Sequence, residues 1–303
     1  MTSNHKITNE RNCRVALRYS DPKNILSFPE LFTPVNTIIH NARTTIKSSN
    51  AMANLNQKGF TLLTDPLDAT INIKDPLHVR NQYFTHMQNL FTQHLGCSSV
   101  MPLNFVFRKS STLRDTLSFG DSLPPGSGTG VVVSVNKAAY TGAIGNVHAD
   151  FTADSVAIVM IREMMESDDT LRGGRFAIYN VWRPLEQVKR WPLAICDAST
   201  VDSEKDLVGR PTPENNNSVL NCLPPPMTSG GKNRHQWFYY PEMTANEILI
   251  FRSWDETNSK QYKKGTLHTA FDDPYSKDND PARQSIEARF VCFWPPSSKS
   301  SKL

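Results

Sequence analysis

The chain has 303 residues, of which 38% are hydrophobic and 20% are charged, and its formal net charge is +4. That length allows one large domain or two ordinary ones, and this composition excludes disorder of the whole chain. Lysine and arginine are scattered, without an RNP-like, zinc-finger or basic-helix pattern, so we expect no binding of nucleic acid. No apolar run approaches the ~18 to 20 residues that span a bilayer, and the first residues do not form a secretory signal. The sequence therefore predicts a soluble intracellular protein.

The cysteines give no sign of a structural cross-link. There are five of them, far apart in the chain and without a Cys-x-x-Cys pair: Cys13, Cys97, Cys196, Cys222 and Cys292. An odd number at such spacing disfavours both a disulfide framework and a zinc-thiolate site. We expect reduced thiols, most of them buried.

The first 77 residues show weak periodicity and many Ser, Thr and Asn. We expect an N-terminal arm with short elements that packs on the core, including a helical piece near residues 35 to 55. Residues 78–95 carry apolar side chains at helical spacing and predict an amphipathic helix. Its three histidines, His78, His86 and His94, lie eight residues apart and so about 80° apart around the helix axis, which does not suit one shared metal.

Residues 78–297 read as one mainly β (α+β) domain. About eight short runs rich in β-branched and aromatic residues are separated by Pro, Gly, Asn and Asp, which favours a barrel or a jelly roll with flanking helices. One helix interrupts them at 151–166, with a cap expected near Thr152 or Asp154. Residues 121–130 and 211–233 look like loops, the second long enough for a mobile flap. We expect residues 298–303 to form a flexible C-terminal targeting tail.

His148 and Asp150 are candidate metal ligands. With 8 His and 29 acidic residues, about one His-x-acid triplet is expected by chance, so the pair alone proves nothing. At the end of a jelly-roll strand, however, the two side chains would lie on one face, about 6.5 Å apart at Cα. His268, at the start of a later run, is the best third ligand. Two histidines and one carboxylate leave open coordination positions, as in non-haem Fe(II) oxygenases, whereas a structural zinc site is closed.

Arg283 and Ser285 are candidates for binding a second acid. Alternation along the last predicted strand places Arg283, Ser285, Glu287 and Arg289 on one face. A guanidinium deep in a barrel, with a serine hydroxyl beside it, suits the distal carboxylate of a keto-diacid whose other end chelates iron. Arg289 is the rival anchor. It lies about 20 Å from Arg283 along an extended strand, so both cannot hold one carboxylate, and the choice stays open.

Four further polar residues are candidates for the substrate pocket. Asn180 and Arg183 belong to the strand-like segment that also contains Trp182, which either packs in the core or faces the pocket. Asn136 and Tyr140 precede the first two metal ligands in the sequence and have only that proximity in their favour. Arg183 would either bind an acidic group of the substrate or hold a loop.

The pattern His148-x-Asp150, His268 and Arg283-x-Ser285 resembles the Fe(II)- and 2-oxoglutarate-dependent oxygenases with a double-stranded β-helix (cupin-like jelly-roll) fold. More specifically, the blocks IYNVWRPL, WPLAICDAST, FYYPEMTANEILIFRSWD, HTAFDDP and RQSIEAR resemble a fungal hydroxylase/desaturase family that includes a gibberellin desaturase and AsaB-like enzymes of secondary metabolism. The resemblance spans residues from about 100 to 296 and covers the N-terminal arm poorly.

The resemblance implies an iron enzyme that uses 2-oxoglutarate and O2, releases succinate and CO2, and oxidises an unactivated C–H bond of a small secondary metabolite. The outcome would be hydroxylation, desaturation or ring closure, and a carboxylate- or amino-acid-type substrate is mildly favoured. Two other classes stay open. One is a cupin-like metal-dependent hydrolase or isomerase, which would not need the Arg283 anchor. The other is a non-catalytic β-sandwich that binds a ligand.

The last three residues, Ser301-Lys302-Leu303, match the peroxisomal import signal Ser-Lys-Leu. The polar segment before them would leave the tripeptide accessible to the import receptor. We therefore expect a peroxisomal protein, or a cytoplasmic one if this signal is not used. The family resemblance does not imply this signal.

Overall fold

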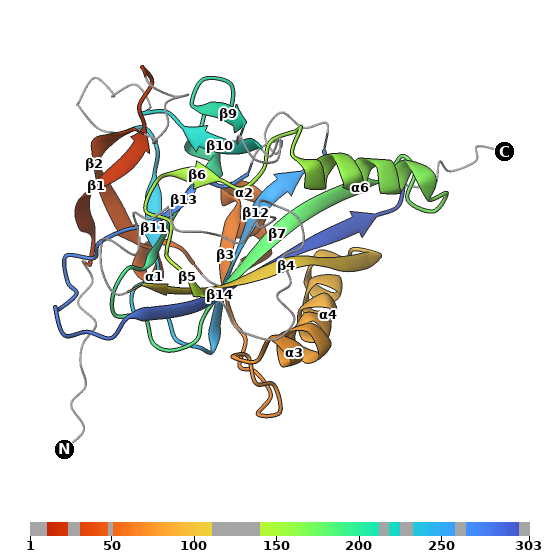
Figure 1. Ribbon diagram of the computed structural model, residues 1–303, viewed down its shortest axis with the longest axis horizontal. Coiled ribbons are helices and arrows are strands. Elements are labelled where there is room, and N and C mark those ends of the chain that lie inside the picture. The colour runs from red at the N-terminus through yellow and green to blue at the C-terminus, as the bar shows by residue number, and fades with distance from the viewer. Residues whose placement is uncertain are drawn as a thin grey trace.

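The computed structural model describes residues 11–23, 31–47, 51–110, 140–211, 218–224, 233–257 and 265–296. Two curved β-sheets form its centre, with helices against their faces (Figure 1). The metal-ligand candidates, the expected anchor and most of the hydrophobic core lie on strands of these two sheets or directly beside them.

The six-stranded sheet contains the longest strands of the described chain. In order across the sheet they are β3 (Phe60–Thr64), β12 (Glu247–Asp255), β7 (Arg175–Pro184), β14 (Arg283–Trp294), β4 (Ser99–Ser110) and β5 (Tyr140–Thr141). All neighbours are antiparallel except the short pair β4 and β5. β14 pairs along nearly its whole length with β7 on one side and β4 on the other, which makes it a central strand.

The second sheet has eight strands, most of them short. In order they are β1 (Cys13–Ser20), β2 (Phe32–Asn41), β11 (Trp237–Tyr239), β8 (Leu193–Cys196), β13 (His268–Ala270), β6 (His148–Ala149), β10 (Ser218–Cys222) and β9 (Leu207–Pro211). β6 and β13 are neighbours in this sheet although they are far apart in the sequence, and His148 pairs with His268. The pairing of these two strands therefore decides where the site forms.

Helices cover both faces of the six-stranded sheet. α4 (Phe84–Leu95) follows the short α3 (Pro76–His78) and one π-helical turn, η2 (Val79–Tyr83), and its buried Met87 and Phe91 pack on the outer face. α6 (Val156–Ser167) packs against Phe176, Ile178, Val291 and Phe293, at the end of the inner face. Of the remaining elements, α1 spans Ala42–Thr45, α2 spans Ala51–Lys58 and the 3-10 turn η3 spans Ala198–Thr200.

Alternation along the strands separates two environments. On β7, Tyr179 and Val181 join the cluster under α4, whereas Asn180 and Trp182 point toward the other sheet. On β14, Ile286 and the apolar residues Ala288 and Phe290 lie in the outer cluster, so the intervening positions face inward. The inner face is where the polar residues gather, as expected for Arg283, Ser285, Glu287 and Arg289.

The structure changes several expectations about the elements. Residues 32–41 form strand β2, and only α1 and α2 represent the helical piece expected near 35 to 55. The residues before 78 supply three strands, β1, β2 and β3, that pair within the two sheets. β10 lies inside the segment expected to be a loop at 211–233, because Val219 and its neighbours pair with β9. The expected loop at 121–130 lies outside the described residues.

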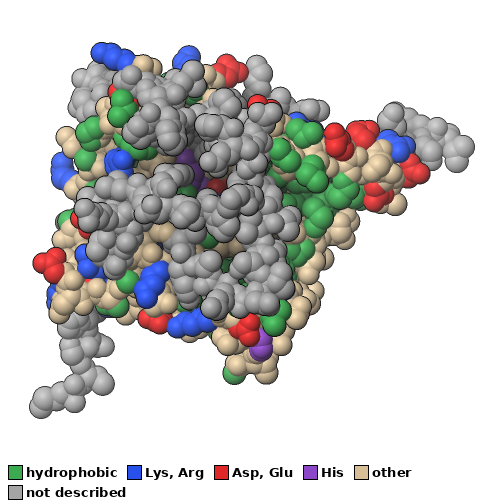
Figure 2. Space-filling model, in the orientation of Figure 1, with side chains coloured by type: hydrophobic (Ala, Val, Ile, Leu, Met, Phe, Trp, Pro, Cys, Tyr) green, Lys and Arg blue, Asp and Glu red, His purple; other side chains and the backbone are tan. Residues whose placement is uncertain are grey.

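The expected helices are present with altered boundaries. The helix at 78–95 begins at Pro76, where the Asp75 side chain accepts a hydrogen bond from the Leu77 amide. α6 has Ser155 at its N-cap, one residue after the expected range, and Thr152 and Asp154 hydrogen-bond to each other. Val156, Val159 and Met160 stay exposed on α6, and Figure 2 shows hydrophobic side chains gathered over that helix.

Within the described part of the chain, no helix is long and apolar enough to cross a membrane. All five cysteines are buried and free, as expected.

Candidate active site

His148, Asp150 and His268 come together between the two sheets. One possible ligand atom from each lies within 4.8 Å of the other two. His148 opens β6, Asp150 follows the end of that strand, and His268 opens β13. His148 and His268 are directly opposite in the antiparallel pair, and their rings lie 4.3 Å apart at the centroids. Strand pairing thus supplies the third residue that the sequence spacing could only suggest.

Both imidazoles are oriented by backbone carbonyls. The Nδ1 of His148 lies 2.9 Å from the carbonyl oxygen of Asn146, and that of His268 lies 3.1 Å from the carbonyl oxygen of Thr266. A carbonyl oxygen only accepts, so each Nδ1 carries a proton and Nε2 is the ring nitrogen that remains for a metal. Burial, and then His268, lower the pKa of His148 to about 3, which keeps this imidazole neutral. Neutral imidazoles with a fixed tautomer are what metal ligation requires.

The Asp150 carboxylate is held by the six-stranded sheet. Arg289 donates to its Oδ1 at 2.8 Å and to its Oδ2 at 3.3 Å, and Ser253 donates to Oδ2 at 2.8 Å. Asn180 lies 3.4 Å from the same Oδ2. Burial alone would raise the pKa of Asp150, but Arg289 and His268 outweigh it and hold the pKa well below its usual range. The carboxylate is therefore charged and oriented, as a metal ligand must be.

This donor set fits a divalent iron. Two neutral nitrogens and one carboxylate oxygen are borderline ligands that suit Fe(II), and they occupy one side of the ion. Within the described residues, no fourth His, Cys, Asp or Glu joins the group. The opposite coordination positions would be left to small molecules, which is the requirement for an oxygenase rather than for a structural ion.

Arg283 lines the same pocket, and Ser285 lies two residues further along β14 on the same face. Arg283 donates from Nη1 to the Trp191 carbonyl oxygen at 2.7 Å, while its buried Nε and the buried Ser285 Oγ have no hydrogen-bond partner among the described residues. Burial, and then the nearby Arg108, lower the pKa of Arg283 to about 9. A desolvated guanidinium without a carboxylate beside it costs free energy that a bound anion would offset.

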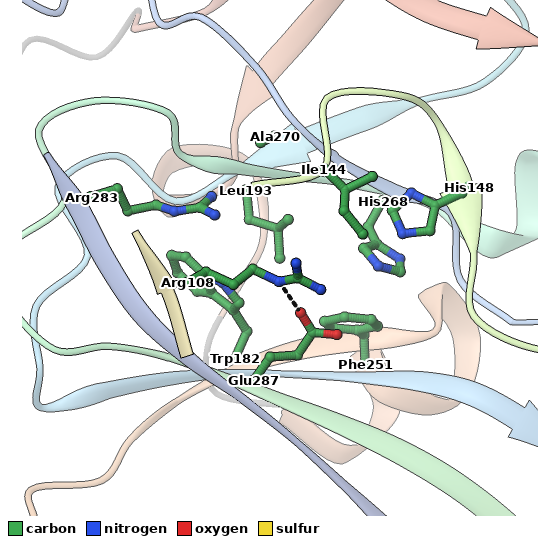
Figure 3. Close-up of a pocket in the computed structure, with 10 residues that line it drawn as sticks. All are labelled: Arg108, Ile144, His148, Trp182, Leu193, Phe251, His268, Ala270, Arg283 and Glu287. Carbon is green, nitrogen blue, oxygen red and sulfur yellow. Dashed lines mark hydrogen bonds and ion pairs between the residues drawn. The ribbon is translucent and has the colours of Figure 1, made fainter. Parts of the chain in front are cut away.

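The pocket itself combines cations with apolar walls. Its lining residues come from both sheets and are labelled in Figure 3: Arg108, Ile144, His148, Trp182, Leu193, Phe251, His268, Ala270, Arg283 and Glu287. In this view Arg108 lies between Arg283 and the two histidines, and its Nε donates to Glu287 Oε2 at 2.8 Å. The pocket therefore has a possible anion position at Arg283 and a metal position at the histidines, with an apolar surface beside them.

Arg289, the rival anchor, has a different environment. Its guanidinium contacts Asp150, Glu287 and Asn104, and it does not line the pocket. Arg289 forms an ion pair with Glu287 and another with Asp150. Arg283 is thus the better-placed residue for an incoming carboxylate.

The structure places the candidate substrate residues in different environments. Arg183 as a pocket residue is contradicted: it is fully buried on the outer face, where it pairs with Asp65 and donates to the carbonyls of Asp65 and Ala245. Its inward-facing neighbour Trp182 lines the pocket instead. Asn180 donates to Glu287 at 2.9 Å and so supports the site from beneath.

The remaining two substrate candidates are not placed in the pocket. Tyr140, in β5, pairs through its backbone with Phe107 of β4, and the Tyr140 side chain lies outside the described part of the structure. Asn136 lies outside the described residues.

Sequence reasoning missed Arg108 and assigned no role in the pocket to Glu287. Both are inward-facing residues on paired strands, and Arg108 lies opposite Ser285 in the register of β4 with β14. The alternation of the run NFVFRKS could have indicated that Arg108 shares a face with every second residue, but the pairing with β14 could not be read from the sequence.

Comparisons with known proteins agree with this geometry. A family model described as an oxidoreductase/YMDC permease-like domain matches residues 9–293. The chain belongs to this family. Its relatives include the hydroxylase/desaturase efuI of Hormonema carpetanum, 28% identical over 82% of this chain and 81% of that protein. Another is the alpha-ketoglutarate-dependent dioxygenase phiK of a fungal species, 26% identical over 78% of this chain and 77% of that protein.

The expected resemblance is confirmed, since the hydroxylase/desaturase asaB and a gibberellin cluster GA4 desaturase are also relatives of this family member. A solved structure, the iron and alpha-ketoglutarate-dependent endoperoxidase NvfI, superposes with a TM-score of 0.69 at 21% identity. The match covers 94% of this chain and 98% of that one. The expected jelly-roll fold is thereby confirmed.

Proposed function

We propose that this family member is an Fe(II)- and 2-oxoglutarate-dependent oxygenase that oxidises an unactivated C–H bond of a small molecule in fungal secondary metabolism. One observation carries the proposal: both histidines of an open two-histidine, one-aspartate group line a pocket together with the buried Arg283, whose Nε has no partner among the described residues. The names of the fungal relatives support it, since they are hydroxylase/desaturases and alpha-ketoglutarate-dependent dioxygenases.

The proposal gives five residues in and beside the pocket distinct tasks. His148, Asp150 and His268 hold the iron, and Arg283 with Ser285 binds the distal carboxylate of 2-oxoglutarate by charge-assisted hydrogen bonds. When bound, the iron supplies the oxidising chemistry, in which O2 and 2-oxoglutarate become succinate and CO2. The protein holds the reactants in order and excludes water, because the lining of the pocket is largely buried.

The substrate faces the apolar side of the pocket. Phe251 packs beside His268 with ring centroids 4.7 Å apart, and Ile144 and Leu193 line the same pocket. Arg108 is the cation nearest this side, so it replaces Arg183 in our proposal that the substrate carries a carboxylate. Hydroxylation, desaturation and ring closure all begin with removal of one hydrogen atom from the substrate and differ in the bond that forms afterwards.

Anaerobic titration tests the function directly. Fe(II) and 2-oxoglutarate added together to the wild-type protein should produce the weak visible charge-transfer band of the chelate, and His148→Ala should abolish it. Absence of the band in the wild type would reject the function, and persistence in the variant would reject the ligand assignment.

The two other classes make different predictions. A metal-dependent hydrolase or isomerase would bind metal but would not require 2-oxoglutarate, so Arg283→Ala would leave its turnover intact. A ligand-binding module would need neither the metal nor the anchor. Succinate formation that depends on Fe(II), O2 and 2-oxoglutarate would exclude both.

We further propose import into peroxisomes through Ser301-Lys302-Leu303, which lie outside the described residues. The support is the match of this tripeptide to the receptor-read signal. A fluorescent protein fused to the N-terminus should enter peroxisomes, and removal of Leu303 should leave it in the cytoplasm. Identical distribution of the two fusions would refute the proposal.

A further inference from the structure

Glu287 is a buried carboxylate shared by two arginines beside the metal site. Its Oε2 accepts from Arg108 Nε at 2.8 Å, and its Oε1 accepts from Arg289 and, at 2.9 Å, from Asn180. It is 5% exposed and lies on β14, two residues before Arg289. Burial alone would raise the pKa of Glu287, but Arg108 and Arg289 outweigh it and keep the pKa far below the usual range.

Arg289 links this carboxylate to a metal ligand. The same Nη2 contacts both Glu287 Oε1 and Asp150 Oδ1, the latter at 2.8 Å. Asp150 Oδ1 is also the oxygen that lies 3.9 Å from His268 Nε2, on the side where a metal would sit. The guanidinium and the metal ion would therefore attract the same carboxylate oxygen.

The balance of charge decides how strongly Arg289 holds Asp150. Among the described residues of this cluster, three arginines, Arg108, Arg283 and Arg289, face two carboxylates, Asp150 and Glu287. In a buried site, interactions between charges are screened less than at the surface. Without Glu287, Asp150 would be the carboxylate left to Arg289, and its attraction to the guanidinium would oppose metal binding.

We propose that Glu287 is a positioning residue that acts on the metal site through Arg289: by sharing the guanidinium, it orients Asp150 while leaving that carboxylate available to the metal. The inference rests on the proposed function only in that the triad binds a divalent metal. It adds a residue outside the triad that sets metal affinity, and Arg108 connects the same residue to the substrate side of the pocket.

Metal affinity of the apoprotein is the direct test. Mn(II), which is stable in air, serves as the probe in calorimetric titration of the wild type and of Glu287→Gln, a change that removes charge with little change in shape. We expect Glu287→Gln to bind Mn(II) about 10- to 100-fold more weakly, the usual range for residues that support metal ligands. Glu247→Gln is the matched control, since Glu247 forms a two-pronged pair with Arg43 away from the pocket and should bind as the wild type does.

A double-variant cycle separates positioning from a general loss of structure. If Glu287 acts through Arg289, adding Glu287→Gln to Arg289→Gln should change Mn(II) affinity by less than about threefold. If Glu287→Gln lowered Mn(II) affinity tenfold in the Arg289→Gln background as well, the proposal would be overturned. Wild-type Mn(II) affinity in the Glu287→Gln single variant would also overturn it. If the single variant does not fold, the comparison within the Arg289→Gln background still decides. Failure of wild-type protein to bind Mn(II) would instead count against the proposed function.

Discussion

At the scale of single residues, partners distinguish two arginines that occupy the same face of one strand. Arg289 is neutralised by Asp150 and Glu287. Arg283 donates to the Trp191 carbonyl oxygen and lies over the Trp182 ring, and its buried Nε has no hydrogen-bond partner among the described residues. An incoming dicarboxylate gains most from the cation that lacks a carboxylate. Position on the strand makes both arginines candidates for the carboxylate anchor, and the charges around each one favour Arg283.

Substitution of these two arginines should affect different ligands. Arg283→Ala should weaken 2-oxoglutarate binding by about 2–5 kcal/mol, roughly thirtyfold or more, because a buried charge-assisted contact is lost. Compared with Arg283→Ala, Arg289→Ala should weaken the binding of 2-oxoglutarate much less and the binding of the metal more. Binding of 2-oxoglutarate measured at saturating metal checks the ranking, and the reverse order would move the anchor to Arg289.

At the scale of an element, the period of two along β7 decides the fate of adjacent residues. Trp182 faces the pocket, and Arg183 faces the helical layer, where Tyr83 and Asp65 accept its hydrogen bonds. The block NVWRPL contains both possibilities, and only the curvature and cover of the sheet determine which face is the site. Arg183 serves the fold.

Arg183→Met should therefore destabilise the protein without changing its site. Removal of one partner from a buried ion pair costs about 3–5 kcal/mol, and we expect the lower end here because the Asp65 carboxylate keeps its contact with His86 Nε2 at 2.8 Å. Denaturant unfolding should register this loss, while the affinity of the folded protein for 2-oxoglutarate stays at the wild-type value. A selective loss of 2-oxoglutarate or substrate binding at normal stability would return Arg183 to the pocket.

A second element-scale constraint lies where the segment before β13 crosses β12. The Thr266 amide donates to the Arg252 carbonyl at 2.8 Å, and a Cβ on Gly265 would overlap the carbonyl oxygen of Ser253. This approach places Thr266, which orients His268, beside Ser253, which holds Asp150. Glycine is needed here for closeness of two backbones.

Gly265→Ala should push these segments apart and damage the site together with the fold. We expect a loss of about 1–3 kcal/mol in the free energy of unfolding, as for other overpacked positions, and weaker metal binding. Gly209→Ala is the control, because among the described residues a Cβ there would meet only Thr152, at an ordinary 3.5 Å. Thermal unfolding and metal titration of both variants check this prediction. Equal stability and equal metal affinity of the two variants would contradict it.

At the scale of the whole molecule, the site lies where the two sheets face each other. The histidines come from the eight-stranded sheet, while Ser253, Asn180 and Arg289, which hold Asp150, come from the six-stranded one. A metal bound by all three ligands would add a link between strands β6 and β13 and, through Asp150, to the opposite sheet. Metal binding and global stability should therefore be coupled.

Metal loading should raise the stability of the whole protein. At a free concentration one hundred times the dissociation constant, binding to the folded state alone adds about 2.7 kcal/mol. The unfolding temperature should rise with Mn(II) in the wild type and return to the apoprotein value with a chelator. His268→Ala should not respond, and a response equal to that of the wild type would place the metal elsewhere.

The sequence indicated the fold class and the triad, because strand periodicity, the His148-x-Asp150 spacing and several long blocks are local features of the chain. It did not indicate that residues 32–41 form a strand, because β2 lies between β1 and β11, and β11 is a short strand almost 200 residues further along the chain. It also assigned no role in the pocket to Arg108 and Glu287, since each becomes a pocket residue only when β4 pairs with β14.

The sequence by itself determined which residue types are available to bind a metal and a dicarboxylate, because side-chain chemistry and the period of a strand need no knowledge of distant neighbours. The tertiary structure alone decided which of them meet. Arg289 is neutralised, Arg183 is turned away and Glu287 is placed between two arginines because each depends on strands that are distant in sequence and adjacent in space.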